Sequence, residues 1–325
     1  MAKSMSLPSW AIGPFEKTAA NPVLTPGKEG FDSWTAYNPA VVYAFGEYHM
    51  FYRAESKDDQ GTVYCGTSRI GYATSKDGLH FEKHGLILDA EDPWELPGGC
   101  EDPRIVIVDG VYHLLYTAYS VTGSPVVTMC SAVSTNLKQW EKKGPMFPDL
   151  HARGQNTKSA CVVVNPQLEA VKIDGRYHMF TNEIYATSED FVHWETCPFQ
   201  ASEYSGSLHE VCTAITDYQH PGEDDIVLFV AGNLTHLCPE RDLFYAISEC
   251  LLDRHNPIKR IDQLTEPVIF ADQPFEKSLE RLTGDSVRGT IFLDSVFRHD
   301  GVWHAYYGAS DLQVGAAFCR EAKEQ

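Results

Sequence analysis

Two acids and an arginine stand together in residues 98–104, which read Gly-Gly-Cys-Glu-Asp-Pro-Arg. A carboxylate held beside a cation is a combination that can transfer a proton or hold a polar substrate. Gly98 and Gly99 have no side chains, so the backbone at this point can approach another group closely. A surface turn with a local ion pair would contain the same residue types, and this segment alone leaves both interpretations open.

The residues after Arg104 predict the strand that must position these groups. Residues 105–108 are apolar and β-branched, Asp109-Gly110 is a turn pair, and residues 111–116 begin a second apolar strand. This order is typical of a β-hairpin. Pro103 has no amide hydrogen to donate to a sheet, so it fits the first position of such a strand. We therefore expect Asp102 at the entrance of the strand.

The same hairpin pattern recurs along the chain, and this recurrence predicts the architecture. A turn followed by an aromatic-rich strand occurs at residues 45–52, 109–116, 174–180 and 300–307, with a weaker copy at 224–230. Five units of short strands, spaced by about 50–65 residues without a long helical pattern, predict an all-β fold and a five-bladed β-propeller. A β-sandwich is the alternative, but the repetition favours the propeller. We expect one domain over residues 1–325, with residues 21–26 pairing with the last unit to close the ring.

The composition excludes some classes of partner. The 325 residues include 45 acids and 26 bases, a formal net charge of −19, whereas nucleic acids and anionic membranes are bound by an excess of Lys and Arg. No apolar run approaches the roughly 20 residues of a membrane span, and residues 1–9 lack the apolar core of a signal peptide. The nine cysteines include no Cys-x-x-Cys pair. We therefore expect a cytoplasmic protein with reduced thiols and no nucleic-acid or membrane partner.

The sequence predicts neither a metal site nor a cofactor site. His209 and His220 do not have the spacing of metal ligands, and neither a P-loop nor a dinucleotide-binding glycine motif is present. Ser68 and Ser159 have no neighbouring His-Asp pattern that would make a serine hydrolase triad. The histidines that recur at one position of each unit are expected to be packing residues, namely His49, His113, His178 and His304.

A propeller would bring polar residues from distant units to one central funnel. Charges at the ends of apolar strands are costly unless they are paired or hydrated, so a cluster around a cavity is a candidate site. Cleavage of a glycosidic bond needs one acid to protonate the leaving oxygen and a second carboxylate to attack the sugar or to activate water. The candidate residues are Asn38, Arg53, Ser68, Arg69, Glu101, Asp102, Lys158, Glu169, Glu183, Glu210, Tyr307 and Asp311.

Four segments of the chain resemble glycoside hydrolase family 130. They are residues 38–54, 67–78, 99–104 and 306–311, with the Glu-Asp-Pro-Arg run and the later Tyr-Gly-Ala-Ser-Asp run as the most specific. The resemblance implies a five-bladed propeller that acts on β-mannosides by inverting hydrolysis or by phosphorolysis. It also implies that Asp102 is the general acid. The subsite for the terminal mannose would then be lined by Asn38, Arg53, Ser68, Arg69 and Asp311.

The choice between water and phosphate as nucleophile depends on residues where the chain departs from the family's phosphorylases. Lys158-Ser159 keeps one cation of the expected phosphate-binding pair, but Asn182-Glu183 stands where a His-Arg dipeptide is expected. A glutamate beside a phosphate dianion would be repelled by it. Glu183 is therefore favoured as the base that activates water, with Glu210 as helper or alternative and Glu169 as third candidate.

We therefore predict an exo-acting inverting β-mannosidase whose substrate is a mannose-containing oligosaccharide, with β-1,2-linked mannosides as the expected substrates. A β-mannoside phosphorylase is the second interpretation, because Lys158 and the arginines remain. A non-catalytic carbohydrate-binding propeller is the third. The retained acids Asp102, Glu183 and Glu210 argue against the third interpretation, since a binding site has no need of an acid and a base.

Overall fold

The computed structural model describes residues 7–59, 66–199, 209–219, 225–232, 243–277 and 289–320, and its regular structure is almost entirely β-strand. The predicted all-β class is confirmed. Two sheets of four antiparallel strands come first, each in sequence order. They contain β2 (Thr35–Ala44), β3 (Glu47–Glu55), β4 (Arg69–Ser75) and β5 (Glu82–Leu88), and then β6 (Gly99–Val108), β7 (Val111–Tyr119), β8 (Val127–Ser134) and β9 (Glu141–Pro145).

The later strands form one 12-stranded sheet that consists of three antiparallel groups. Parallel pairing of β10 with β14 and of β16 with β18 joins these groups. The only α-helix among the described residues is α1 (Pro148–Ala152). The groups are β10 (Cys161–Val164), β11 (Tyr177–Phe180), β12 (Ile184–Ser188) and β13 (Glu195–Pro198); β14 (His209–Ile215), β15 (Ile226–Gly232), β16 (Leu243–Asp253) and β17 (Asn256–Gln263); and β18 (Gly289–His299), β19 (Val302–Ala309), β20 (Gln313–Arg320) and β1 (Glu16–Lys17).

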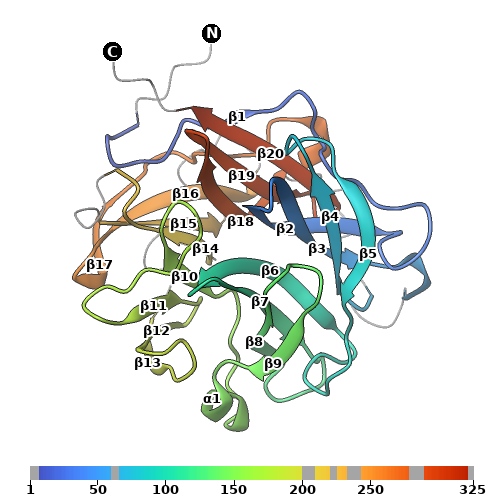
Figure 1. Cartoon of the computed structure of the whole chain (residues 1–325), viewed down its shortest axis with the longest axis horizontal. Helices are drawn as coiled ribbons and strands as arrows, with labels where there is room; N and C mark the ends of the chain where they lie inside the picture. The colour runs from blue at the N-terminus through green and yellow to red at the C-terminus, as the bar shows by residue number, and fades with distance from the viewer. Residues whose placement is uncertain are drawn as a thin grey trace.

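The five groups are arranged around a common centre, with β2, β6, β10, β14 and β18 on the inside (Figure 1). This arrangement matters for function because the first strand of every group begins near the same axis. Side chains from positions far apart in the sequence can therefore meet there.

The predicted hairpin turns lie at the Asp-Gly pairs of the sequence. Asp109, Asp174 and Asp300 each have a positive φ of about 50° and are each followed by a glycine of positive φ. Two successive residues of positive φ are the signature of the two-residue turn whose twist matches that of the flanking strands. The Asp-Gly pairs therefore fix the register of three of the hairpins locally.

The N-terminal segment completes the last group. Glu16 and Lys17 of β1 pair with Phe318 and Ala317 of β20, and the Val314 amide donates to the carbonyl of Leu24 over 2.9 Å. The expected pairing of residues 21–26 with the last unit is confirmed at Leu24. The first and the last described strands, β1 and β20, consequently lie side by side (Figure 1).

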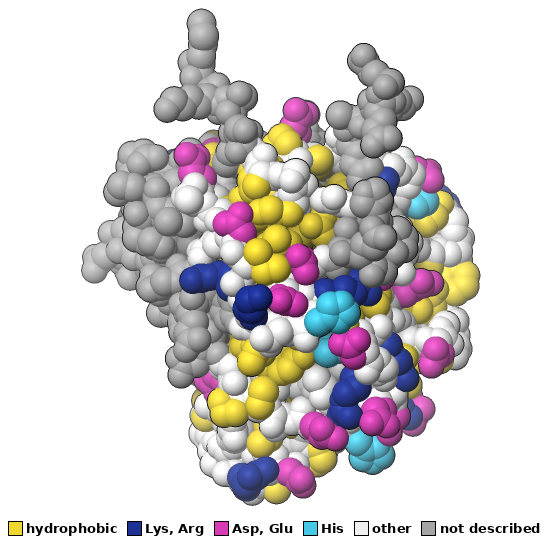
Figure 2. Space-filling view, turned by 90° about the vertical axis from the view of Figure 1, so that its left-hand side faces the viewer, with side chains coloured by type: hydrophobic (Ala, Val, Ile, Leu, Met, Phe, Trp, Pro, Cys, Tyr) yellow, Lys and Arg dark blue, Asp and Glu magenta, His cyan; other side chains and the backbone are white. Residues whose placement is uncertain are grey.

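The interior and the surface of the molecule bear on the predictions for histidine, cysteine and membrane spans. His49, His178 and His304 are buried, as expected of packing residues, and His113 is half-buried with its ring against Phe191. The described cysteines form no disulfide. Acidic, basic and apolar side chains are interspersed on the face seen in Figure 2. Within the described ranges, none of the helices has the length and apolar character needed to cross a membrane.

Candidate active site

A β-bulge interrupts the first strand of four of the five groups at the same place. The bulges lie between Tyr37 and Pro39 in β2 and between Glu101 and Arg104 in β6, and β14 and β18 have them at residues 211–213 and 293–295. A bulge leaves an extra residue unpaired and turns its side chain in a new direction. The residues turned in this way are Asn38, Asp102, Cys212 and Asp294.

A pocket of about 260 Å³ opens at these strand entrances. Six of the predicted site residues line it together, although they come from all parts of the chain. The lining also contains four residues that the sequence analysis did not select. The complete lining is Tyr37, Asn38, Arg53, Asp102, Lys158, Glu210, Tyr245, Thr290, Phe292 and Asp311.

Arg53 is the cation at one side of the pocket, and it contacts three carboxylates. Its Nε lies 2.9 Å from Glu55, one terminal nitrogen lies 2.8 Å from Glu101, and the other lies 3.1 Å from Asp102. In a regular strand the side chains of Glu101 and Asp102 would point to opposite faces. The bulge in β6 places both beside the same guanidinium. One positive charge therefore faces three acids.

This crowding separates the proton affinities of the two neighbouring acids. Burial raises the pKa of Glu101 to about 7, against the attraction of Arg53. Burial also acts to raise the pKa of Asp102, but attraction to Arg53 and Lys158 and a hydrogen bond from Asn38 outweigh it and lower the pKa to about 2. At neutral pH an ionised Asp102 therefore lies beside a Glu101 that titrates near this pH.

Asn38 is fixed beside Asp102 by close packing. Its Nδ2 donates to Oδ1 of Asp102 over 2.7 Å, and it comes within contact distance of Gly308 in β19. A Cβ atom on Gly308 would collide with the side-chain oxygen of Asn38 and would lie 2.9 Å from its backbone nitrogen. The glycine of the Tyr-Gly-Ala-Ser-Asp run is therefore required for Asn38 to occupy its place.

A second carboxylate, Glu210 of β14, also lines the pocket. Lys158 lies 3.1 Å from Oε1 of Glu210, and the hydroxyl of Ser159 donates a short hydrogen bond to the other oxygen. Attraction by Glu210, Asp102 and Glu101 raises the pKa of Lys158, although burial acts to lower it. Burial raises the pKa of Asp311, on the same pocket, to about 6. The pocket thus presents three carboxylates, two of which, Asp102 and Glu210, are each paired with a cation.

Ser68 does not line the pocket but binds two residues that hold it, Glu55 and Arg53. Its hydroxyl donates to Glu55 over 2.8 Å and accepts from Nε of Arg53 over 3.0 Å. Its backbone packs directly against Gly99, where φ is +109° and a Cβ atom would overlap the Ser68 peptide. The close backbone approach expected at the double glycine is confirmed.

Six predicted site residues do not line the pocket. Ser68 and Glu101 contact Arg53 without belonging to the lining, and the other four lie elsewhere. Arg69 pairs instead with Asp59 and Asp89, and the hydroxyl of Tyr307 donates to Glu276 over 2.7 Å in the interior. Glu183 is exposed in the turn between β11 and β12. Glu169 is exposed in a turn beside Ile107, at the end of β6 away from Asp102.

The family model for glycoside hydrolase family 130, described as beta-1,4-mannooligosaccharide phosphorylase, matches residues 29–323. The chain belongs to glycoside hydrolase family 130. The family membership expected from the Glu-Asp-Pro-Arg and Tyr-Gly-Ala-Ser-Asp runs is confirmed.

Two curated relatives of this family 130 chain come from Thermoanaerobacter sp. (strain X514). A 1,2-beta-oligomannan phosphorylase is 25% identical over 307 residues, which are 93% of this chain and 96% of the relative. A beta-1,2-mannobiose phosphorylase is 28% identical over 314 residues, with the same two coverages. A solved structure is 29% identical with a TM-score of 0.84, covering 99% of this chain and 98% of the other. The description of that structure states that the GH130 family of mannoside phosphorylases contains glycoside hydrolases that target beta-1,2 mannosidic linkages in Candida mannan.

The site of this family 130 member includes residues that sequence reasoning missed. Tyr37 lies under the Arg53 guanidinium, 5.0 Å from ring centroid to charge centre. Glu55 is completely buried and binds Arg53, Ser68, Tyr37 and Thr35. Glu55 follows Arg53 by two residues on β3, so strand alternation places both on one face, and this spacing was the available signal. Phe292, Thr290 and Tyr245 carry no comparable signal.

The pocket is lined by aromatic rings, carboxylates and an amide. Among the described residues, no group of three or more His, Cys, Asp or Glu side chains is placed to hold a metal ion. Aromatic rings beside carboxylates and amides are well matched to a sugar, whose ring has apolar faces and many hydroxyl groups.

Proposed function

We propose that this family 130 member removes a terminal mannose from β-mannosides, with β-1,2-linked oligosaccharides as the substrate class and Asp102 as the general acid. The observation that carries the proposal is the placement of Asp102 and Glu210 on different strands around one 260 Å³ pocket. The names of the two curated relatives and of the solved structure support the β-1,2 linkage.

Proton delivery by Asp102 requires a proton that this residue does not keep at neutral pH, because its pKa is lowered to about 2. Glu101 has a pKa of about 7 and shares Arg53 with Asp102. We propose that the two carboxyls hold one proton between them. A sugar that fills the pocket displaces water from Asp102, and the proton moves from Glu101 to Asp102 and then to the leaving oxygen, directly or through a sugar hydroxyl.

The geometry supports water as the nucleophile, with Glu210 as the base. Of the described residues that line the pocket, Arg53 and Lys158 are the two cations, and each is already paired with a carboxylate. Asp102, Glu210 and Asp311 add three acids to the lining. A phosphate dianion would have to approach this excess of negative charge, whereas a water molecule would not. Glu210 lines the pocket and Glu183 does not, so the proposal assigns the base to Glu210.

Phosphorolysis is the second candidate function. The family model and both curated relatives carry phosphorylase names, and these comparisons favour phosphate over water. Lys158 is 33% exposed at its side chain and would be the residue that receives the anion. In this version Lys158 exchanges Glu210 for phosphate when the anion enters.

The experiment is an assay on β-1,2-mannobiose in phosphate-free buffer and in buffer with inorganic phosphate. Hydrolysis releases mannose at the same rate in both buffers, and nuclear magnetic resonance shows α-mannose first, because inversion converts a β-linkage to an α-product. Release of mannose 1-phosphate that depends on phosphate would establish the second candidate. Absence of cleavage in both buffers, with the sugar bound, would support the non-catalytic alternative.

We also propose that the five strand groups are the blades of a single-domain five-bladed β-propeller. The radial arrangement in Figure 1 and the recurrent bulge of the inner strands support this assignment. The cytoplasmic location stays a prediction from the sequence.

A further inference from the structure

Arg104 lies two residues beyond Asp102 on β6 and is almost completely buried, with 5% of its surface exposed. Its Nε donates to the carbonyl of Cys212 and its Nη2 to the carbonyl of Val211, both over 3.0 Å. Its Nη1 contacts the carbonyl of Asp102 over 3.4 Å. The guanidinium therefore binds backbone carbonyl groups at two bulges.

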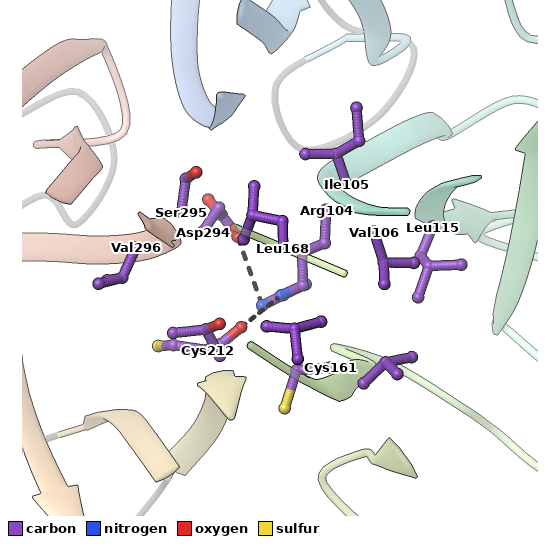
Figure 3. A pocket seen from close by; sticks show the side chains of 13 residues that line it. Arg104, Ile105, Val106, Leu115, Cys161, Leu168, Cys212, Asp294, Ser295 and Val296 are labelled. Carbon is purple, nitrogen blue, oxygen red and sulfur yellow. Dashed lines mark hydrogen bonds and ion pairs between the residues drawn. The ribbon is translucent and has the colours of Figure 1, made fainter. Parts of the chain in front are cut away.

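A third strand completes the surroundings of this guanidinium. Asp294, at the bulge of β18, lies 3.3 Å from Nη2, and the ring of Phe292 lies 5.6 Å from the charge centre. Figure 3 shows Arg104 reaching across a small pocket toward Asp294 and Cys212. This pocket has a volume of about 20 Å³ and is lined by residues further along the strands that carry the active site.

The two strands joined by Arg104 belong to different sheets. β6 pairs within the sheet of β6–β9, whereas β14 belongs to the 12-stranded sheet. Asp102 is the bulged residue of β6, and Glu210 immediately precedes Val211 on β14. The hydrogen bonds of Arg104 therefore connect the strand of the proposed acid to the strand of the proposed base, which no sheet ladder among the described strands joins.

We propose that Arg104 is a positioning residue that sets the separation of Asp102 and Glu210 across the pocket. The proposal rests on the proposed function, because it takes these two residues as acid and base. Inverting glycosidases need about 6.5–9.5 Å between the two carboxyl groups to admit the nucleophile. Arginine suits this role because its planar fork presents several donors in fixed directions, and a flexible lysine ammonium would hold the carbonyls less strictly.

The experiment compares wild type with Arg104→Lys on two substrates. β-1,2-Mannobiose needs protonation of its leaving oxygen, whereas 2,4-dinitrophenyl β-mannoside has a leaving group that departs without an acid. A misplacement of about 1 Å can cost about 10²-fold in rate, so we expect kcat on mannobiose to fall by about 10²-fold. On the activated substrate we expect a fall of less than about tenfold, with KM little changed. Glu210 keeps its contacts with Lys158 and Ser159 in the variant, so the displaced group is Asp102, and acid catalysis contributes only to the first substrate.

Arg254→Lys is the matched control. Arg254 is also a buried arginine, paired with Asp217 over 2.6 Å, and it does not line the pocket. Replacing it should lower the melting temperature and leave the ratio of the two rates unchanged. A merely structural role for Arg104 would produce the same result, since loss of folded enzyme reduces both rates equally.

The outcomes separate the inference from the proposed function. A folded Arg104→Lys variant with an unchanged rate ratio overturns the positioning role while Asp102 and Glu210 keep theirs. Wild-type protein that cleaves neither substrate, with or without phosphate, overturns the proposed function. If Arg104→Lys does not fold, Asp294→Ala removes the anchor of the guanidinium on β18. For that variant we expect the rate on mannobiose to fall more than the rate on the dinitrophenyl mannoside. An unchanged ratio of the two rates would contradict the positioning role of Arg104.

Discussion

The side-chain amide of Asn38 donates a hydrogen bond to Asp102 over 2.7 Å, and each of the two is the bulged residue of the first strand of its group. Both have positive φ values, 43° and 47°, which Asn and Asp tolerate better than most residues do. The same backbone irregularity thus occurs in adjacent sheets, and the two irregular residues meet at the pocket. This contact links the Asn-Pro-Ala run to the Glu-Asp-Pro-Arg run.

Replacement of Asp102 by Asn tests the general acid. The amide keeps the size of the side chain but cannot donate a proton to the leaving oxygen, so we expect a loss of about 10²–10⁴-fold in kcat on β-1,2-mannobiose. The far-ultraviolet circular dichroism spectrum should be unchanged. A folded variant with full activity on this substrate would show that another group protonates the leaving oxygen.

The dependence of activity on pH tests the shared proton of Glu101 and Asp102. Below about pH 7 Glu101 is protonated, because burial raises its pKa to about 7, and the pair holds the proton that catalysis needs. Above that pH both carboxyls are ionised. We therefore expect kcat/KM on mannobiose to fall as the pH rises through about 7, and the Glu101→Gln variant to lose this limb of the profile. A limb that persists unchanged in Glu101→Gln assigns the titration to another group.

Two glutamate variants, measured side by side, test the assignment of the base. Glu210→Gln should reduce kcat by about 10²–10⁴-fold on both mannobiose and the dinitrophenyl mannoside, since activation of water is needed for either leaving group. Glu183→Gln should stay within about twofold of wild type, because Glu183 is exposed and does not line the pocket. The reverse pattern would return the role of base to Glu183, as the sequence analysis had favoured.

A Gly308→Ala variant tests the packing that holds Asn38. The added methyl would collide with the Asn38 side chain and push it away from Asp102, so we expect a loss of at least about tenfold in kcat on mannobiose. In a double-mutant cycle with Asn38→Ala, the Gly308→Ala change should cost less than it does alone, because the side-chain collision is removed and only the 2.9 Å approach to the backbone nitrogen remains. Additive losses in the cycle would mean that Gly308 acts through another contact.

The hairpins and the composition of the site segments were predictable from the sequence because their signals are local. Asp109-Gly110 and its counterparts specify a turn within two residues, and the alternation of the flanking strands follows from it. Asp102 was expected at a strand entrance on the evidence of Pro103 and the apolar run. Recurrence of the same pattern then predicted that strand entrances from distant units would meet.

Only the tertiary structure decided which side chains face the pocket. A bulge shifts the alternation of a strand by one residue, so Glu101 and Asp102 lie on one side although their spacing predicts opposite sides. Glu183 and Glu210 are both acids near the start of a strand, yet the exposed turn removes one from the pocket and β14 brings the other into it. Arg104 joins two strands that are more than 100 residues apart in sequence. The chain order therefore determined the repeated unit, and the packing of units around one centre determined the site.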